Sequence, residues 1–223
     1  MRITAIREKT VSLSDPASPS PDASREMTAS AVAIDVETPS GTVTGYGFSS
    51  IGRYAQGSLI SERFGPRLLA AAHLGDGHGG FDPAHGWAVM MRREKPGGDG
   101  DRAGAVGVLD MAMWDAAAKI ADVPLWRLLA DRYNGGRHHE RVPVFATGGL
   151  YHPGGDPGAL ADEVRSYLDR GYERVKIKCG EGGLGVGRSR IETALGALGG
   201  AGDRLAVDLA CMCATSAETQ AMA

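Results

Sequence analysis

The chain lacks a surplus of basic residues, a long hydrophobic run and a cysteine framework. Its 223 residues carry 24 Lys and Arg against 27 Asp and Glu, a net charge of −3, so the charge balance does not favour binding to nucleic acid or to an anionic membrane. No stretch approaches the roughly 18 apolar residues of a membrane helix, and residues 1–7 alternate like a strand, unlike a signal peptide. Three cysteines, an odd number, make no disulfide framework. A cytoplasmic protein is expected.

The first part of the chain mixes strand and helix patterns. Alternation at 2–13, 28–38 and 42–48, with a turn at Pro39–Gly41, predicts an antiparallel meander. Apolar residues at helical spacing predict helices, in the order 59–73, 81–93, 103–121 and 124–129. We therefore expect an α+β domain over residues 1–133.

The pattern changes after Arg141. Strand-like segments at 142–146, 173–180 and 204–209 alternate with helix-like segments at 159–170 and 187–199. This order is typical of a parallel sheet or a (β/α) barrel. Only three strands fit, so we expect residues 141–223 to form the first three βα units of an incomplete, TIM-like (β/α) barrel.

The segment from Glu173 to Gly180 is the most informative. Apolar residues alternate there with Lys176 and Lys178, so a strand places both lysines on one face. Parallel sheets normally have both faces covered, and unpaired charge is costly to bury. The pair is therefore expected to face an anion or a weakly acidic proton. Asp208, near the end of the next strand, would meet Lys178 at the same edge, although Asp208 alone could equally cap a helix.

Several motifs together resemble the mandelate racemase branch of the enolase superfamily. They are Leu-Asp-Met-Ala-Met-Trp-Asp-Ala at 109–116, Val-Pro-Leu-Trp-Arg-Leu-Leu at 123–129, Lys-Ile-Lys at 176–178 and Ala-Val-Asp at 206–208. The match covers nearly all of residues 1–208, with 1–133 as the capping domain. Within that branch, four segments resemble D-tartrate dehydratases: Gly45-Tyr-Gly-Phe48, Gly52-Arg-Tyr54, Ile60-Ser-Glu-Arg-Phe64 and Glu94-Lys-Pro-Gly-Gly98.

The resemblance implies an acid-sugar dehydratase, a hydro-lyase that uses Mg²⁺. Lys178 would abstract the proton α to a carboxylate, Lys176 would hold that carboxylate, and Asp208 would be a metal ligand. Lys95 and His152 would bind the substrate, a small dihydroxy acid or acid sugar. A homo-oligomer is expected of the full-length form.

Three departures leave alternatives open. After Asp208 the family usually continues Ala-Asn-Gly-Arg, but here the tail begins Leu-Ala-Cys-Met-Cys, which lacks the remaining metal carboxylates and the later Asp–His acid. We therefore expect a truncated and inactive form; a thiolate site at Cys211 and Cys213 is the weaker explanation of the tail. Ile51 and His152 stand where the tartrate enzymes have Asn and Tyr. Another acid-sugar dehydratase, a racemase of the same branch, or a non-catalytic fragment are the alternatives.

Overall fold

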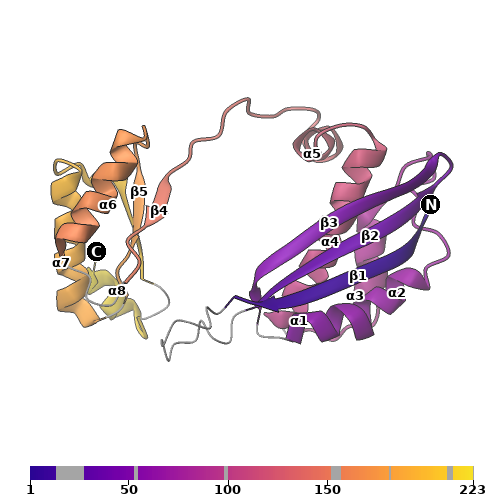
Figure 1. Ribbon diagram of the computed structural model, residues 1–223, viewed down its shortest axis with the longest axis horizontal. Coiled ribbons are helices and arrows are strands. Elements are labelled where there is room, and N and C mark those ends of the chain that lie inside the picture. Colours follow the sequence, from indigo (N-terminus) through magenta and orange to yellow (C-terminus); the bar gives the residue numbers. More distant parts are fainter. Residues whose placement is uncertain are drawn as a thin grey trace. The chain divides into compact units, whose positions relative to one another are not determined.

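The computed structural model describes residues 1–13, 28–52, 55–97, 100–151, 157–180, 182–209 and 213–222. The chain forms two compact units, Met1–His138 and His139–Ala223, and each is described by itself (Figure 1). Among the described helices, none is long and apolar enough to cross a membrane.

The N-terminal unit is built on an antiparallel sheet in the order β1–β2–β3, with β1 at Arg2–Ser12, β2 at Thr28–Thr38 and β3 at Gly41–Gly52. The middle strand alternates strictly, and Val32, Ile34 and Val36 are buried. The expected meander is therefore present, with its apolar side chains on one face.

Helices cover that apolar face (Figure 1). The first three run almost without a break: α1 at Ala55–Ser58, the π-helix η2 at Leu59–Phe64 and α2 at Gly65–Leu69. Next come α3 at Pro83–Met91, α4 at Asp101–Ile120 and α5 at Leu125–Tyr133. Leu109 and Met113 of α4 are fully buried in the core, as the helical spacing predicted.

Two glycines of β3 allow α4 to lie directly against the sheet. A Cβ atom on Gly45 would lie 2.1 Å from the carbonyl oxygen of Ala112, and one on Gly47 equally close to that of Val108. Both distances are far inside van der Waals contact, so any side chain would push the helix away. The structure thus gives the Gly-Tyr-Gly-Phe motif, one of the four segments that resemble D-tartrate dehydratases, a packing role within β3.

The segment Ile60–Phe64, which also resembles D-tartrate dehydratases, lies in regular structure. Ile60 and Phe64 are fully buried in η2, and Arg63 between them pairs with Glu94 at 3.0 Å. The reason is the helical period, which turns residues four apart toward the same core. Of the Gly52-Arg-Tyr54 segment, Gly52 ends β3, while residues 53 and 54 lie outside the described residues.

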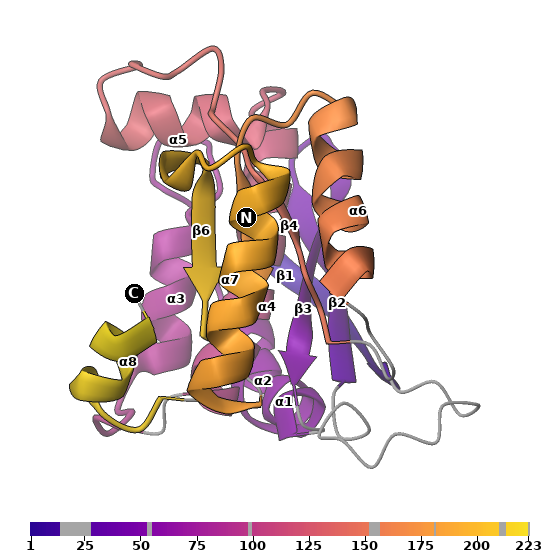
Figure 2. The same cartoon turned by 90° about the vertical axis from the view of Figure 1, so that its left-hand side faces the viewer.

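The C-terminal unit has a parallel sheet in the order β4–β5–β6, with β4 at Ala146–Gly148, β5 at Val175–Lys178 and β6 at Leu205–Asp208. Helices α6 at Pro157–Asp169 and α7 at Gly183–Ala197 connect the strands and pack on one face, as Figures 1 and 2 show. Val175, Ile177 and Cys179 are fully buried against these helices, which confirms the predicted alternation in the lysine strand.

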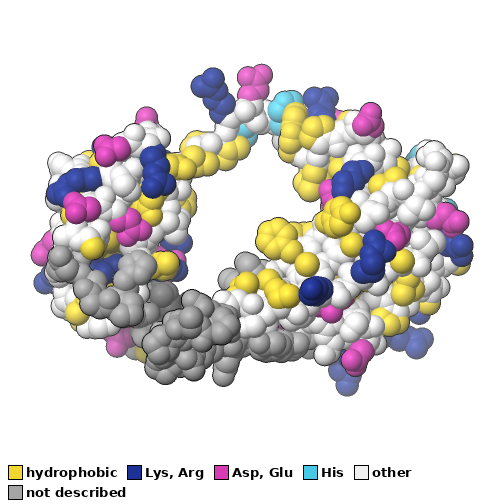
Figure 3. Space-filling model, in the orientation of Figure 1, with side chains coloured by type: hydrophobic (Ala, Val, Ile, Leu, Met, Phe, Trp, Pro, Cys, Tyr) yellow, Lys and Arg dark blue, Asp and Glu magenta, His cyan; other side chains and the backbone are white. Residues whose placement is uncertain are grey.

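One expected strand of this unit was wrong, and one helix was not predicted. The strand expected at 142–146 begins only at Ala146, where the backbone amide donates to the Arg174 carbonyl at 3.0 Å. Val142, Val144 and Phe145 lie before that pairing and are 51–74% exposed; their part of the chain carries exposed hydrophobic side chains in Figure 3. An apolar run without a pairing partner cannot join a sheet. A short helix, α8 at Ser216–Met222, was not expected.

A candidate active site at the ends of two parallel strands

The parallel register brings the lysine strand and Asp208 together. Lys176 lies opposite Ala206 and Lys178 opposite Asp208 in the pairing of β5 with β6. Because neighbouring parallel strands end at the same edge of a sheet, Lys178 and Asp208 both come from the carboxyl ends of their strands. The sequence predicted this placement, and the structure shows it.

Both ammonium groups converge on one oxygen. Asp208 Oδ2 lies 2.6 Å from Lys178 Nζ and 2.9 Å from Lys176 Nζ. The three side chains are 23–32% exposed, so the cluster is partly shielded from solvent. Two cations facing one carboxylate leave a net positive charge, which favours an anionic group beside them.

The lysine face is more open than expected. We predicted that both faces of this sheet would be covered, but in the described part of the unit α6 and α7 cover only the face that holds Val175 and Ile177. On the opposite face, Thr147 and Ala206 flank Lys176 in the pairing register and are exposed. The lysine charges are therefore stabilised by the ion pairs with Asp208 and by hydration, without a covering layer in the described part of the unit.

Arg190 of α7 fixes the backbone beside the cluster. Its Nε donates to the Lys178 carbonyl at 3.0 Å, and its Nη2 donates to the Gly149 carbonyl. One side chain therefore links the ends of β5 and β4. The same guanidinium lies 4.1 Å from the ring centroid of Tyr151, a cation–π contact. No sequence spacing singled out Arg190, because the carbonyls that it binds are far from it along the chain.

A carboxylate of α6 holds the end of β4. Gly149 has φ +65°, and its amide donates to both oxygens of Glu163 at 3.2 Å. The Tyr167 hydroxyl donates to Glu163 Oε1 at 2.7 Å, and this hydrogen bond is the main reason why the pKa of Tyr167 is raised. The loop after β4 is thus held by its own helix and by Arg190.

The described residues do not by themselves fit a magnesium site. The ion prefers about six oxygen ligands and usually takes one or two carboxylates from the protein. Asp208 is an oxygen donor of the right kind, but both lysines already occupy its Oδ2. Across the described ranges, no group of three His, Cys, Asp or Glu residues could hold a metal. Asp208 as a ligand therefore stays a prediction, and no step is derived through the metal.

Of the two predicted substrate-binding residues, the structure describes Lys95 alone. Lys95 is exposed in the N-terminal unit, after α3, and its carbonyl accepts a 2.8 Å hydrogen bond from Arg102. Glu94 beside it is almost fully buried and pairs with Arg63 and Arg67 at 3.0 and 2.9 Å. Burial would raise the pKa of Glu94, but the hydrogen bonds from these two arginines outweigh it and the pKa is lowered. His152 lies outside the described residues, as does Cys211.

Sequence comparison finds relatives among acid-sugar dehydratases over part of the chain; no family model matches it. A D-galactonate dehydratase family member, RspA of Halomonas elongata, is 39% identical over 80 residues, which are 36% of this chain and 18% of the relative. D-mannonate dehydratase of Novosphingobium aromaticivorans is 33% identical over 91 residues, covering 39% of this chain and 20% of that enzyme.

Solved structures share the fold over nearly the whole chain. A racemase from Streptomyces coelicolor with bound magnesium aligns with a TM-score of 0.72 at 23% identity, covering 99% of this chain and 59% of that one. A mandelate racemase/muconate lactonizing enzyme-like protein from Rubrobacter xylanophilus aligns with a TM-score of 0.64 at 23% identity, covering 94% and 53%. This chain therefore spans a little over half the length of these structures.

The fold of the chain is therefore that of mandelate racemase/muconate lactonizing enzyme-like proteins. Its sequence relatives include a D-galactonate dehydratase family member and a D-mannonate dehydratase. The resemblance drawn from the motifs is thereby confirmed at the level of the branch.

Proposed function

We propose that this chain carries the proton-abstracting half of an acid-sugar dehydratase. The observation that supports it is the cluster of Lys176, Lys178 and Asp208 at the ends of two adjacent parallel strands. A carboxylate substrate would replace part of the anionic charge that Asp208 supplies, and Lys176 would hold it. Lys178 would lie beside the carbon α to that carboxylate.

The chemistry follows from the protonation of Lys178. In the resting cluster its ammonium donates to Asp208 and cannot accept a proton. As a neutral amine it would take the α-proton, and the electron pair of the C–H bond would move into the substrate carboxylate as an enediolate. Return of that pair would expel the β-hydroxyl, which leaves as water after protonation by a separate acid, and the enol product becomes a keto acid. Magnesium would stabilise the enediolate when bound.

Among acid sugars, the substrate that we propose is D-tartrate. Its support is the set of motifs at Gly45–Phe48, Ile60–Phe64 and Glu94–Gly98, although the first two have packing roles in the structure. Lys95 and His152 would then bind the second carboxylate or the hydroxyls. We further propose that residues 1–133 are the capping domain, that 141–223 are the first three βα units of a barrel, and that the complete protein is a cytoplasmic homo-oligomer.

The test uses the complete product of the gene that encodes this chain. It would be assayed with magnesium against D-tartrate, D-galactonate, D-mannonate and D-gluconate, following keto-acid formation and exchange of the α-proton in deuterated water. Lys178→Ala and Lys178→Arg should each lower exchange at least about 10²-fold, the usual scale for loss of a general base. Lys9→Ala, on β1, is the control. Normal exchange in Lys178→Arg would exclude Lys178 as the base.

Two alternatives give different outcomes in the same assay. A racemase would exchange the α-proton and invert the configuration without forming a keto acid. A non-catalytic protein would do neither, with or without magnesium. Because no group of three His, Cys, Asp or Glu side chains in the described ranges could hold a metal, we expect the 223-residue chain alone to form no keto acid.

A further inference from the structure

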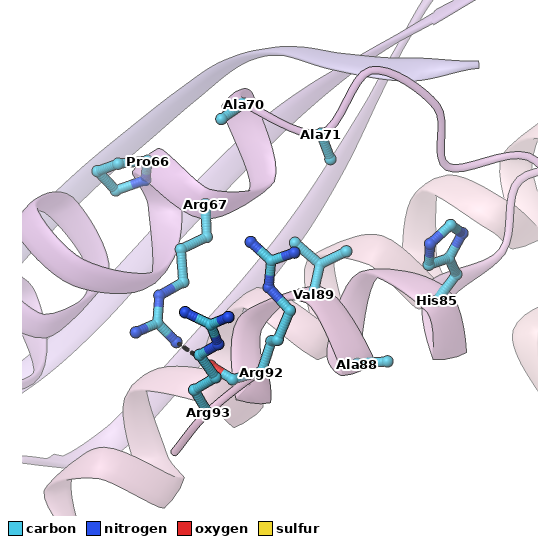
Figure 4. Close-up of a pocket in the computed structure, with 9 residues that line it drawn as sticks. All are labelled: Pro66, Arg67, Ala70, Ala71, His85, Ala88, Val89, Arg92 and Arg93. Atoms are coloured by element: carbon cyan, nitrogen blue, oxygen red, sulfur yellow. Dashed lines mark hydrogen bonds between the residues drawn. The ribbon is translucent and has the colours of Figure 1, made fainter.

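A cationic pocket of about 730 Å³ lies between α2 and α3 in the N-terminal unit (Figure 4). Arg67, Arg92, Arg93 and His85 supply all of its polar side chains, and the rest of its lining is alanine, valine and proline. No acidic side chain among the described residues lines it. Figure 4 shows Arg67 descending from α2 and Arg92 and Arg93 rising from the end of α3, with their guanidinium groups turned toward the space between the helices.

One of these cations has an ordinary structural role. Arg67 Nη1 donates to the Met90 carbonyl in the last turn of α3 and lies 2.9 Å from Glu94 Oε1. A cation at this helix end is favourable because the final carbonyls carry partial negative charge. Arg67 therefore stabilises the end of α3 by this hydrogen bond and ion pair. The other two arginines are not required for that role.

Arg92 and Arg93 have no such role. Within the described ranges, neither guanidinium forms an ion pair or a hydrogen bond, and both residues are exposed. Glu94, which follows them, is already shared by Arg63 and Arg67, with Arg102 at 3.7 Å. This side of the unit is thus locally positive in a chain whose net charge is −3, and such a concave positive region attracts anions.

The backbone at Arg93 keeps this side chain at the pocket. Its φ is +61°, in the left-handed region that glycine adopts without cost. A residue with a Cβ atom is strained there by about 1 kcal/mol or more. The conformation ends α3 and directs the chain away from it, while the Arg93 side chain lines the pocket.

We propose that this pocket binds a small organic dianion. Arg92 and Arg93 would pair with its phosphate or carboxylate oxygens, for which the planar guanidinium donors are suited. The apolar wall formed by Ala70, Ala71, Ala88 and Val89 would contact its carbon skeleton. The volume exceeds that of a bare inorganic ion, which is why an organic ligand fits better than free phosphate.

The experiment titrates the 223-residue chain with phenyl phosphate and with phthalate by calorimetry, using benzamide as a neutral control. We expect at least one dianion to bind, and its affinity to fall as salt rises from about 0.05 to 0.2 M, because screening weakens the contact. Binding of only one of them identifies the preferred oxyanion. Absence of binding by both, or equal binding of benzamide, overturns the proposal.

The variants separate binding from folding. Arg92→Ala with Arg93→Gly should weaken binding at least about tenfold, while the melting temperature stays equal or rises because glycine relieves the strain. Ala88→Glu, which places a carboxylate at the wall, should also abolish binding. Arg137→Ala with Arg141→Ala removes the same charge from exposed positions and should bind normally. Unchanged affinity in the pocket variants would show that the anion binds elsewhere.

Discussion

Lys178 Nζ lies 2.6 Å from Asp208 Oδ2, across two parallel strands whose register places the residues directly opposite each other. Lys176 reaches the same oxygen from two residues earlier. A single carboxylate therefore pairs with two ammonium groups and leaves the cluster with a net positive charge. Its removal would leave two like charges close together without a counter-ion.

Asp208→Asn should make this lysine pair more reactive. Acetylation by acetic anhydride near neutral pH, measured by mass spectrometry, should rise at Lys176 or Lys178 relative to Lys9, because their nitrogens would no longer be held by the Asp208 carboxylate. Asp203→Asn, at an exposed acid close to β6, is the matched control and should change nothing. Equal labelling in Asp208→Asn and the parent chain would contradict the shared ion pair.

Arg190→Ala should loosen the ends of β4 and β5. It leaves the carbonyls of Gly149 and Lys178 without their shared donor, at a cost of about 1–3 kcal/mol for partly buried groups. Hydrogen exchange of peptides from residues 146–151 and 175–180 should therefore accelerate. Arg188→Ala, at an exposed position on the same helix, should leave the rates unchanged; equal acceleration in both variants would refute the role of Arg190.

Gly45→Ala should destabilise the N-terminal unit strongly. The added Cβ would overlap the Ala112 carbonyl, and overpacking of this kind costs at least about 1–3 kcal/mol. Gly107→Ala is the matched control because nothing lies within 4 Å of the new atom, and alanine within a helix should stabilise by about 0.5–1 kcal/mol. Urea unfolding followed by tryptophan fluorescence reports on this unit, since Trp87, Trp114 and Trp126 all belong to it.

Asp35 should make the N-terminal unit sensitive to strong acid. Hydrogen bonds from Arg7 and then from Thr44 lower its pKa to about 2. A carboxylate with a lowered folded-state pKa contributes stability above its unfolded value, near 3.9, and loses it as the pH falls toward 2. Asp35→Asn should therefore flatten the change in urea midpoint between about pH 4.5 and 2.5. Asp162→Asn, at an exposed acid of α6, should not; a parent-like slope in Asp35→Asn would exclude this origin.

Local patterns determined most of the secondary structure. Alternation was enough for β2 and β5 because one face of each strand is buried and the other is not. Helical spacing was enough for α4 because its apolar stripe packs on the sheet. The strand expected at 142–146 failed for a related reason: an apolar run indicates burial only if a partner strand is available, and the sequence does not state which segments pair.

The sequence by itself determined that two lysines share a face and that Asp208 ends the next strand, since both follow from the two-residue period and the βα order. Only the tertiary structure decided that all three meet at one oxygen, that Arg190 ties Lys178 to Gly149, and that Gly45 and Gly47 are contacts of α4. The physical reason is the separation along the chain of the residues that interact. Periodicity is a property of neighbours along the chain, whereas an ion pair, a shared carbonyl donor or a close helix–sheet approach depends on which distant segments the folded backbone brings within a few ångströms.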